Sequence, residues 1–290
     1  MPSIAIRKFA KPGKTLVGSD SHTPTCGAMG MIAIGAGGLD VAVAMATGTY
    51  YLQCPSVVRV NLVGKKAKWA SAKDVILYIL QQLSVKGGVN KIIEYTGEGL
   101  KELSLTDRAT ICNMGAELGA TTSVFPTDEI TKEYLIQQGR EEDYVELKAD
   151  EDATYDEEIT VDLSKLVPLT AKPHSPDAVV PVSELRGMKI NQVVIGSCTN
   201  SSLPDMLKAV KILKGRRVAT HVSLVIAPGS SSILAMLSKC GALADMIASG
   251  ARILECGCGP CIGMGQAPLS KGVSLRTINR NFKGRSGTND

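Results

Sequence analysis

The sequence predicts an α/β protein built on parallel sheets, and the clearest evidence lies in its second half. Apolar runs at Gln192–Ile195, Val222–Ala227 and Arg252–Leu254 each end in a loop that contains glycine. We expect strand, loop and helix to repeat there three times, which is the pattern of strands that pair in parallel. Functional groups in such sheets collect at the carboxyl ends of the strands.

The first half contains a similar alternation of elements. Ser56–Val63 alternates between apolar and polar residues and predicts a strand, and Ile92–Tyr95 predicts a shorter one. Apolar residues at helical spacing predict four helices, at Leu39–Thr47, Ser71–Leu83, Leu105–Leu118 and Asp128–Gln138. We expect Thr106 to open the third of these, with Asp107 in its first turn.

The domain organisation is predicted from a change in composition. From Gly139 to Pro181 the chain is acidic and punctuated by proline, which indicates the end of one domain and a linker, with a polar surface stretch at Glu141–Glu158. We expect α/β domains at residues 1–54, 55–172 and 173–290, the last of which carries a cluster of cysteines.

Composition excludes several functional classes. The net charge of +4 is small and dispersed, which argues against a nucleic-acid partner. No apolar run approaches the ~20 residues of a membrane span, and Met1–Lys14 does not resemble a signal peptide. Eight cysteines in an aliphatic chain of this size indicate reduced thiols or metal ligands, so we expect a cytoplasmic location.

The segment Cys256-Gly-Cys258-Gly-Pro-Cys261 is the strongest chemical signal. Its spacing suits a redox dithiol, a zinc site or an iron–sulfur cluster. Glycine rather than tryptophan precedes Cys258, which disfavours the dithiol, and structural zinc needs four closed ligands. Cys198 is the one persuasive distant partner, and this favours three thiolates around a cluster. Cys256 is either a ligand or a neighbouring loop residue.

The remaining cysteines and histidines carry no motif. We expect four cysteines to be buried small hydrophobic residues, namely Cys26, Cys54, Cys112 and Cys240. We expect two histidines, His174 and His221, to be structural or exposed.

Six short motifs, in order along nearly the whole chain, resemble those of the aconitase superfamily, which comprises aconitases and isopropylmalate isomerase large subunits. They are Gly18–Pro24, Cys112–Glu117, Gly119–Pro126, Gly196–Ser202, Cys258–Met264 and Asn279–Arg285. The resemblance implies three-layer α/β/α domains around an iron–sulfur site. Gly115–Pro126 and Gly196–Ser202 resemble bacterial-type aconitate hydratases most.

The resemblance also implies a cofactor and its ligands. Cys198, Cys258 and Cys261 would hold a [4Fe–4S] cluster whose fourth iron polarises the departing hydroxyl group. Asn113 and Asn279 would donate hydrogen bonds around the cluster.

Three further residues would contact the substrate. Arg280 and Arg285 would bind carboxylates of a small tricarboxylate or dicarboxylate hydroxy acid, since guanidinium pairs with carboxylate in a bidentate manner. Ser21 would be a polar substrate contact.

A histidine and two carboxylates complete the set implied by the resemblance. His22 and Glu117 would form a pair near the iron, in which the carboxylate fixes the imidazole tautomer for proton transfer. Asp20 would partner another histidine, but Pro2 stands at about that position.

The implied reaction is the isomerisation of citrate and isocitrate through cis-aconitate, a step of the tricarboxylic acid cycle. The alternatives are a 3-isopropylmalate dehydratase or homoaconitase large subunit, and a non-catalytic iron–sulfur or RNA-binding regulator. Compared with the family, the chain looks truncated at both ends. We expect a swivelling domain or separate small subunit to supply the base, so that the chain alone binds the cluster without completing the cycle.

Overall fold

The computed structural model describes residues 2–288, with side chains from Ile4 onward. The chain divides into two compact units. The N-terminal unit comprises Pro2–Ala171 and Val179–Val182, and the C-terminal unit comprises Lys172–Ala178 and the described residues from Ser183 onward. Residues 2–171 of the first two predicted domains lie in the N-terminal unit, and the three-domain division stays a prediction.

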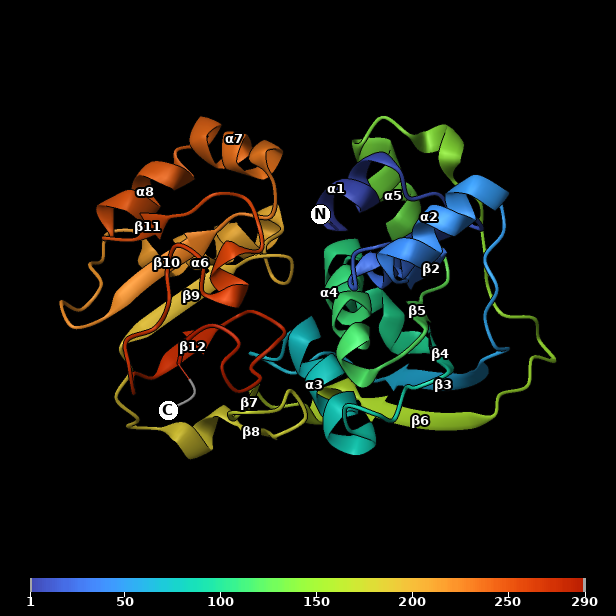
Figure 1. Cartoon of the computed structure of the whole chain (residues 1–290), viewed down its shortest axis with the longest axis horizontal. Coiled ribbons are helices and arrows are strands. Elements are labelled where there is room, and N and C mark those ends of the chain that lie inside the picture. The colour runs from blue at the N-terminus through green and yellow to red at the C-terminus, as the bar shows by residue number, and fades with distance from the viewer. Residues whose placement is uncertain (1, 289–290) are drawn as a thin grey trace. The chain divides into compact units, whose positions relative to one another are not determined.

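A four-stranded parallel sheet organises the N-terminal unit (Figure 1). Its order is β5-β4-β3-β6, with β3 at Ser56–Val63, β4 at Lys91–Thr96, β5 at Thr122–Val124 and β6 at Glu157–Asp162. The two strands expected from the sequence are present as β3 and β4. The prediction of a linker over residues 139–181 is wrong for the part that forms β6, because β6 pairs with β3 along six residues. The division between the two units does fall at the end of this stretch, between Ala171 and Ser183.

One face of this sheet carries the main core. Val58, Val60 and Leu62 alternate along β3 and are fully buried against α3 (Ala72–Leu83) and α4 (Leu105–Gly115). The opposite face is polar, and there Arg59 of β3 donates to Thr96 of β4. Alternate residues of β3 therefore point into the core, which is why its sequence predicted a strand.

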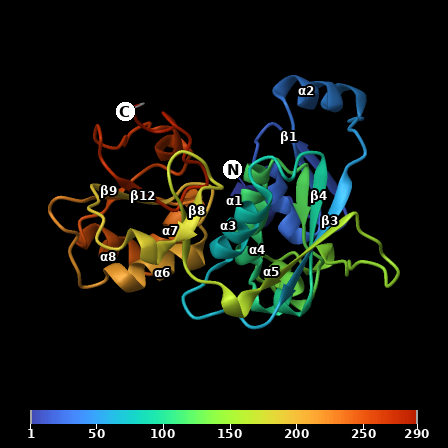
Figure 2. The same ribbon diagram turned by 90° about the horizontal axis from the view of Figure 1, so that it is seen from below.

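A smaller parallel pair, β1 (Thr15–Gly18) and β2 (Ile32–Gly35), lies beside this core. The 3-10 helix η1 (Thr23–Met29) connects the two strands, and all seven of its residues are buried. The helix α2 (Gly38–Thr47) follows β2 but buries none of its residues, and Figure 2 shows it standing away from the sheet of its unit.

The other regular elements of the N-terminal unit are α1 (Pro2–Lys8), α5 (Glu129–Gln137) and the antiparallel pair β7 (Leu169–Ala171) and β8 (Val179–Pro181). Short 3-10 helices along the whole chain are η2 (Glu98–Glu102), η3 (Ala116–Leu118), η4 (Glu141–Asp143), η5 (Leu163–Lys165), η6 (Val182–Leu185) and η7 (Gly259–Ile262).

The start of α4 differs from the prediction. Ser104, not Thr106, is the N-cap: its hydroxyl accepts from the Asp107 backbone N–H at 3.3 Å, and the Asp107 carboxylate accepts from the Ser104 backbone N–H at 3.1 Å. This reciprocal capping box places the N-cap two residues earlier than expected, while α4 begins at Leu105 as the sequence predicts.

The C-terminal unit contains a second parallel sheet, of order β11-β10-β9-β12. Its strands are β9 (Gln192–Gly196), β10 (Ser223–Ala227), β11 (Arg252–Ile253) and β12 (Ser274–Arg276). The three apolar runs are therefore strands, as predicted. The α-helix expected after the third run is replaced by the single turn η7, because glycine and proline interrupt that segment. The short strand β12 was not predicted.

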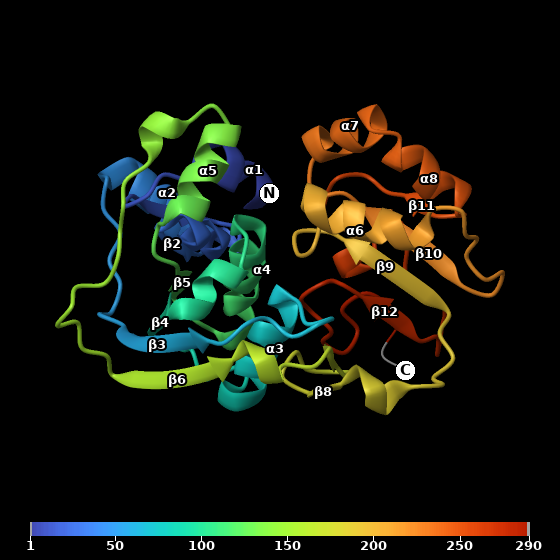
Figure 3. The ribbon, with the colours of Figure 1, turned by 180° about the vertical axis from the view of Figure 1, so that it is seen from behind.

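The two faces of this sheet are covered differently. The helices α6 (Leu203–Leu213), α7 (Ser231–Lys239) and α8 (Ala242–Ala248) share a core with Leu224 and Ile226 of β10. Figure 3 shows these helices together on one side of β9 and β10. On the other face, Val194 of β9 and Val225 of β10 pack against Cys261, which follows β11, and Ile278, which follows β12. The α/β class with parallel sheets is confirmed, and the layer on this face is irregular chain rather than helix.

Within the described residues, no single helix has the length and apolar character to cross a membrane. One sharply bent pair, α7 with α8, meets that test by length and composition only.

A buried ion pair connects α4 to α5. The Arg108 guanidinium is fully buried and donates to both carboxylate oxygens of Asp128, at 2.5 and 2.9 Å. Asp128 also accepts from the Thr131 backbone N–H at 3.2 Å and so caps α5. One carboxylate thus neutralises a buried cation and begins a helix.

We expect Asp128→Ala to lower the free energy of unfolding by about 3 kcal/mol, because it leaves the Arg108 cation buried without its counter-charge. Glu129→Ala is the matched control, since the Glu129 side chain is 73% exposed and its loss should change stability by ~0.5 kcal/mol or less. Urea unfolding of the three proteins measures both effects. Equal stabilities of the two variants would contradict a stabilising role for the Arg108–Asp128 ion pair.

Candidate functional site

The loop after β1 carries the first group of predicted site residues. The Asp20 carboxylate accepts from the His22 backbone N–H at 2.9 Å, and the Asp20 carbonyl accepts from the Thr23 N–H at 3.0 Å. A Cβ atom at Gly35 of β2 would lie 3.0 Å from that carbonyl, so a larger residue there would push the loop by a few tenths of an ångström. These contacts fix a tight turn that places His22 at the start of η1.

His22 and Glu117 form a buried pair. The His22 Nε2 atom lies 3.1 Å from Glu117 Oε1, and the two residues are 6% and 5% exposed. Glu117 belongs to η3, directly after α4. The Ser21 hydroxyl lies 3.3 Å from His22 Nδ1. The structure therefore brings three predicted residues together, with a carboxylate positioned to fix the imidazole tautomer.

Asp20 is a half-exposed carboxylate that also faces His22. Its Oδ1 atom lies 3.7 Å from His22 Nδ1. The hydrogen bond with the His22 side chain is the largest cause that lowers the pKa of Asp20 to about 2, although partial burial opposes it. Asp20 is thus charged at neutral pH and stabilises the histidine loop.

Asn113 belongs to the same group, and a residue that the sequence did not single out connects it. Its side-chain amide donates to the Thr25 hydroxyl at 3.1 Å, and Thr25 donates to the His22 carbonyl at 2.5 Å. Asn113 is 1% exposed. The spacing of Thr25, three residues after His22 in one 3-10 turn, is the only sequence signal that could have indicated it.

The C-terminal unit holds the second group, at the carboxyl edge of its sheet. Cys198 follows β9, and Cys258 and Cys261 follow β11, on either side of β10. The chain leaves β9 through Gly196, which has a φ of +111° and lies so close to β10 that a Cβ atom would be 2.0 Å from the Ala227 carbonyl. Only glycine fits this exit, which turns Cys198 out of the strand.

Two nitrogen donors face the thiols. The Asn279 amide donates to Cys198 Sγ at 3.8 Å, and the Arg285 guanidinium donates to Cys261 Sγ at 3.5 Å. Cys261 is buried, Cys198 is half-buried and Cys258 is exposed. Donors of this kind stabilise thiolate sulfur, so the predicted roles of Cys198, Cys261 and Asn279 have matching contacts.

The donor set fits an iron–sulfur cluster in its chemistry. It offers free thiols, with amide and guanidinium N–H groups directed at two of them, and the buried Nε of Arg285 has no partner among the described residues. Within residues 2–288, however, no three His, Cys, Asp or Glu side chains are grouped closely enough to hold a metal ion. The ligand roles of Cys198, Cys258 and Cys261 therefore stay predictions.

The remaining cysteines divide into two kinds. Cys26 and Cys112 are buried as predicted, and burial raises the pKa of Cys26 to about 11. The prediction of burial is wrong for Cys54 and Cys240, which are exposed because one lies in the extended connection after α2 and the other ends α7. Two histidines are exposed, namely His174 and His221.

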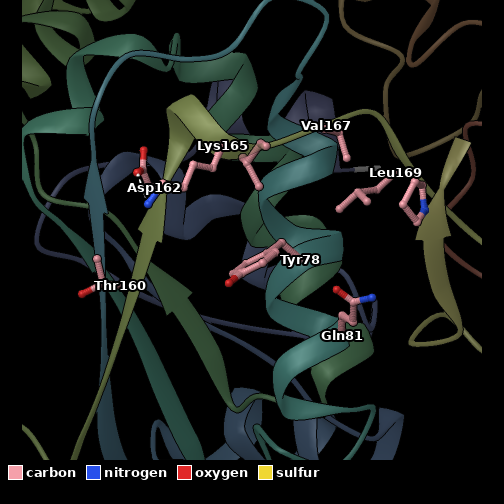
Figure 4. A pocket seen from close by; sticks show the side chains of 9 residues that line it. Tyr78, Gln81, Thr160, Asp162, Lys165, Val167 and Leu169 are labelled. Carbon is pink, nitrogen blue, oxygen red and sulfur yellow. Dashed lines mark ion pairs between the residues drawn. The ribbon is translucent and has the colours of Figure 1, made fainter. Parts of the chain in front are cut away.

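A hollow of about 460 Å³ lies elsewhere in the N-terminal unit, between α3 and the chain around β6 (Figure 4). Tyr78 and Gln81 project into it from α3, and Asp162 and Lys165 flank it. No predicted site residue lines it, so it is separate from both groups described above.

We expect Asp20→Asn to destabilise the protein by about 1 kcal/mol at pH 6, a value reduced for solvent screening of this half-exposed group. Because the folded-state pKa is depressed, the contribution of Asp20 is present above its unfolded pKa and is lost as the pH falls toward 2. The difference between wild type and variant in urea unfolding should therefore shrink from pH 6 to pH 3. A constant difference over this range would rule out the charge of Asp20 as its cause.

Comparison with known proteins identifies the family. The model of the aconitase family (aconitate hydratase) matches residues 3–187 and 183–290. The chain is 44% identical to 3-isopropylmalate dehydratase large subunit 2 of Archaeoglobus fulgidus over 285 residues, which cover 98% of the chain and 68% of the relative. A 3-isopropylmalate dehydratase large subunit of Clostridium kluyveri has the same identity and coverage.

The methanogen homoaconitase large subunit of Methanocaldococcus jannaschii is 40% identical, over 98% of the chain and 70% of the relative. The chain thus spans about two thirds of the length of such relatives. The crystal structure of Thermococcus kodakaraensis aconitase X (holo-form) aligns at a TM-score of 0.49 and 16% identity, over 86% of the chain and 58% of that structure. On its family match and its close relatives, the chain belongs to the aconitase family of hydro-lyases.

Proposed function

We propose that the chain forms the catalytic core of a large subunit that dehydrates and rehydrates a hydroxy acid of the 3-isopropylmalate or homocitrate type. The observation that supports this proposal is the 44% identity to 3-isopropylmalate dehydratase large subunits over 98% of the chain. The relatives favour this alternative over the expected citrate substrate and its place in the tricarboxylic acid cycle. These relatives outweigh the resemblance of Gly115–Pro126 and Gly196–Ser202 to aconitases.

In this proposal Cys198, Cys258 and Cys261 bind a [4Fe–4S] cluster. When bound, the cluster supplies a Lewis acid that polarises a hydroxyl group. The contacts of Asn279 and Arg285 support the ligand role of the cysteines, because their N–H groups face the sulfur atoms of Cys198 and Cys261.

The chain's own residues bind the substrate and move a proton. Arg280 and Arg285 bind substrate carboxylates, and Ser21 adds a polar contact. His22, held by Glu117 at 3.1 Å, gives a proton to the hydroxyl that leaves as the C–O bond breaks. Asn113 keeps the His22 loop in place through Thr25.

The proton on the neighbouring carbon must go to a base, and we assign that base to a partner. The relatives carry the name large subunit, which supports a small subunit as the source. We also propose a cytoplasmic location, because all eight cysteines are free thiols and such thiols persist in reducing compartments.

Anaerobic reconstitution with iron and sulfide tests the cofactor. We expect about four irons per chain and the absorption and EPR signals of a [4Fe–4S] cluster. Cys258→Ser should abolish these signals, whereas Cys54→Ser, which removes an exposed cysteine outside the motifs, should leave them unchanged. One zinc per chain, or a reversible Cys258–Cys261 disulfide without metal, would contradict the proposal.

Turnover tests the substrate. The reconstituted chain is mixed with the small subunit of a 3-isopropylmalate dehydratase, and formation of the unsaturated acid is followed by absorbance. We expect 3-isopropylmalate or homocitrate to react at least tenfold faster than citrate, and little turnover without the partner, because the base is then absent. If citrate reacts fastest, the proposed substrate class is wrong and the chain is an aconitate hydratase core.

A further inference from the structure

We propose that Arg276 is a positioning residue that holds the Cys258–Cys261 segment in the conformation needed for ligand binding. The inference rests on the proposed cluster site, but its geometric part is tested without the cluster. Neither the motifs nor the family comparison singles out Arg276.

The Arg276 guanidinium makes three hydrogen bonds from the carboxyl end of β12. Its Nη1 donates to the Pro260 carbonyl at 2.9 Å, its Nη2 to Gln192 Oε1 at 2.9 Å, and its Nε to the Ser274 hydroxyl at 2.9 Å. Pro260 lies between the two cysteines and directly precedes Cys261. A strand of the sheet therefore holds the centre of the cysteine motif through a planar, rigid fork of donors.

Gln192 orients that fork and adds a second attachment. It is 3% exposed at the start of β9, and its Oε1 also accepts from the Ser274 hydroxyl at 2.7 Å. Its Nε2 donates to the Ala267 carbonyl at 3.2 Å. Arg276 and Gln192 together thus bind the backbone of the cysteine segment at Pro260 and at Ala267, on either side of the turn that follows η7.

Other side chains attach the segment elsewhere: Arg285 bonds Cys261 Sγ, and Gln266 bonds Arg252 and Ser223, but these bonds do not reach the Pro260 carbonyl. Between β11 and β12 the segment forms only the single turn η7, and the side chains of Ile262 and Met264 are 45% and 65% exposed. Cys261 is the one cysteine of the motif that packs into the small core beneath. Its sulfur can hold one position only if the backbone at Pro260 does.

Partial burial of the guanidinium indicates that its hydrogen bonds stabilise the Cys258–Cys261 segment. Desolvation lowers the pKa of Arg276, which indicates a cation partly removed from water. Three oxygen acceptors compensate for that removal, and hydrogen bonds of a charged donor are stronger than neutral ones. Loss of the fork should therefore loosen the segment locally.

Alkylation of the apo chain by iodoacetamide, read at each cysteine by mass spectrometry, measures that loosening. We expect Arg276→Ala to raise the rate at buried Cys261 about tenfold. Arg276→Lys should also raise it, although less. Lysine keeps the positive charge but lacks the fork, so an increase there is due to lost hydrogen bonds rather than lost charge.

The chain provides matched controls. Arg59→Ala removes another strand arginine, which donates to Thr96 in the other unit, and should leave Cys261 unchanged. Cys26 and Cys112 are buried in the N-terminal unit and report opening of that unit, whereas half-buried Cys198 reports opening of the C-terminal unit. Faster labelling confined to Cys261 supports the proposal. Equal rates in wild type and Arg276→Ala, or equal acceleration at Cys26, Cys112 or Cys198, overturn it.

Iron release to a chelator from the reconstituted chain is the second measurement. We expect Arg276→Ala to lose iron several-fold faster than wild type and Arg59→Ala. If wild type takes up no iron, the proposed cofactor fails, while the labelling at Cys261 still decides whether Arg276 holds the segment. If Cys261 labelling accelerates but iron release does not, the positioning role in ligand binding is wrong.

Discussion

The parallel pairing of β9 with β10 on one side and β12 on the other is the constraint on which the C-terminal unit depends. Because all these strands run in one direction, their carboxyl ends meet at one edge, and the chain leaves each of them toward the same region. Gly196 makes this possible at β9, where any side chain would collide with the Ala227 carbonyl. Cys198 and Asn279 come together for this reason, although 81 residues separate them.

The two faces of that sheet are covered by different kinds of structure. Three helices cover one face and supply an ordinary aliphatic core. The other face holds the cysteine segment, whose glycines and proline prevent a helix and leave its backbone to be held by side chains. Arg276 and Gln192 bond that backbone, and Arg285 bonds the Cys261 sulfur. The irregular layer is thus ordered by polar bonds together with the burial of Pro260 and Cys261.

In the N-terminal unit, α4 and the turn η3 that follows it serve both stability and the site. Arg108 of α4 forms the buried ion pair with Asp128, and Asn113 of the same helix reaches the His22 loop through Thr25. The Glu117 carboxylate of η3 then lies 3.1 Å from His22 Nε2. Because these side chains belong to one rigid run of chain, a change in the packing of α4 would move the partners of His22 as well.

The sequence by itself determined the strands and helices in which the apolar residues are also the buried ones. The alternation of Ser56–Val63 and the apolar run of Gln192–Ile195 predicted strands, and the cysteine and histidine motifs predicted the candidate residues. Only the tertiary structure decided the rest. Acidic Glu157–Asp162 is a strand because β3 offers it a partner, and Arg276 contacts Pro260 because β12 pairs with β9. The local sequence pattern indicates which secondary structure a segment prefers. The pairing of strands that are distant in sequence decides whether that structure forms and which residues it contacts.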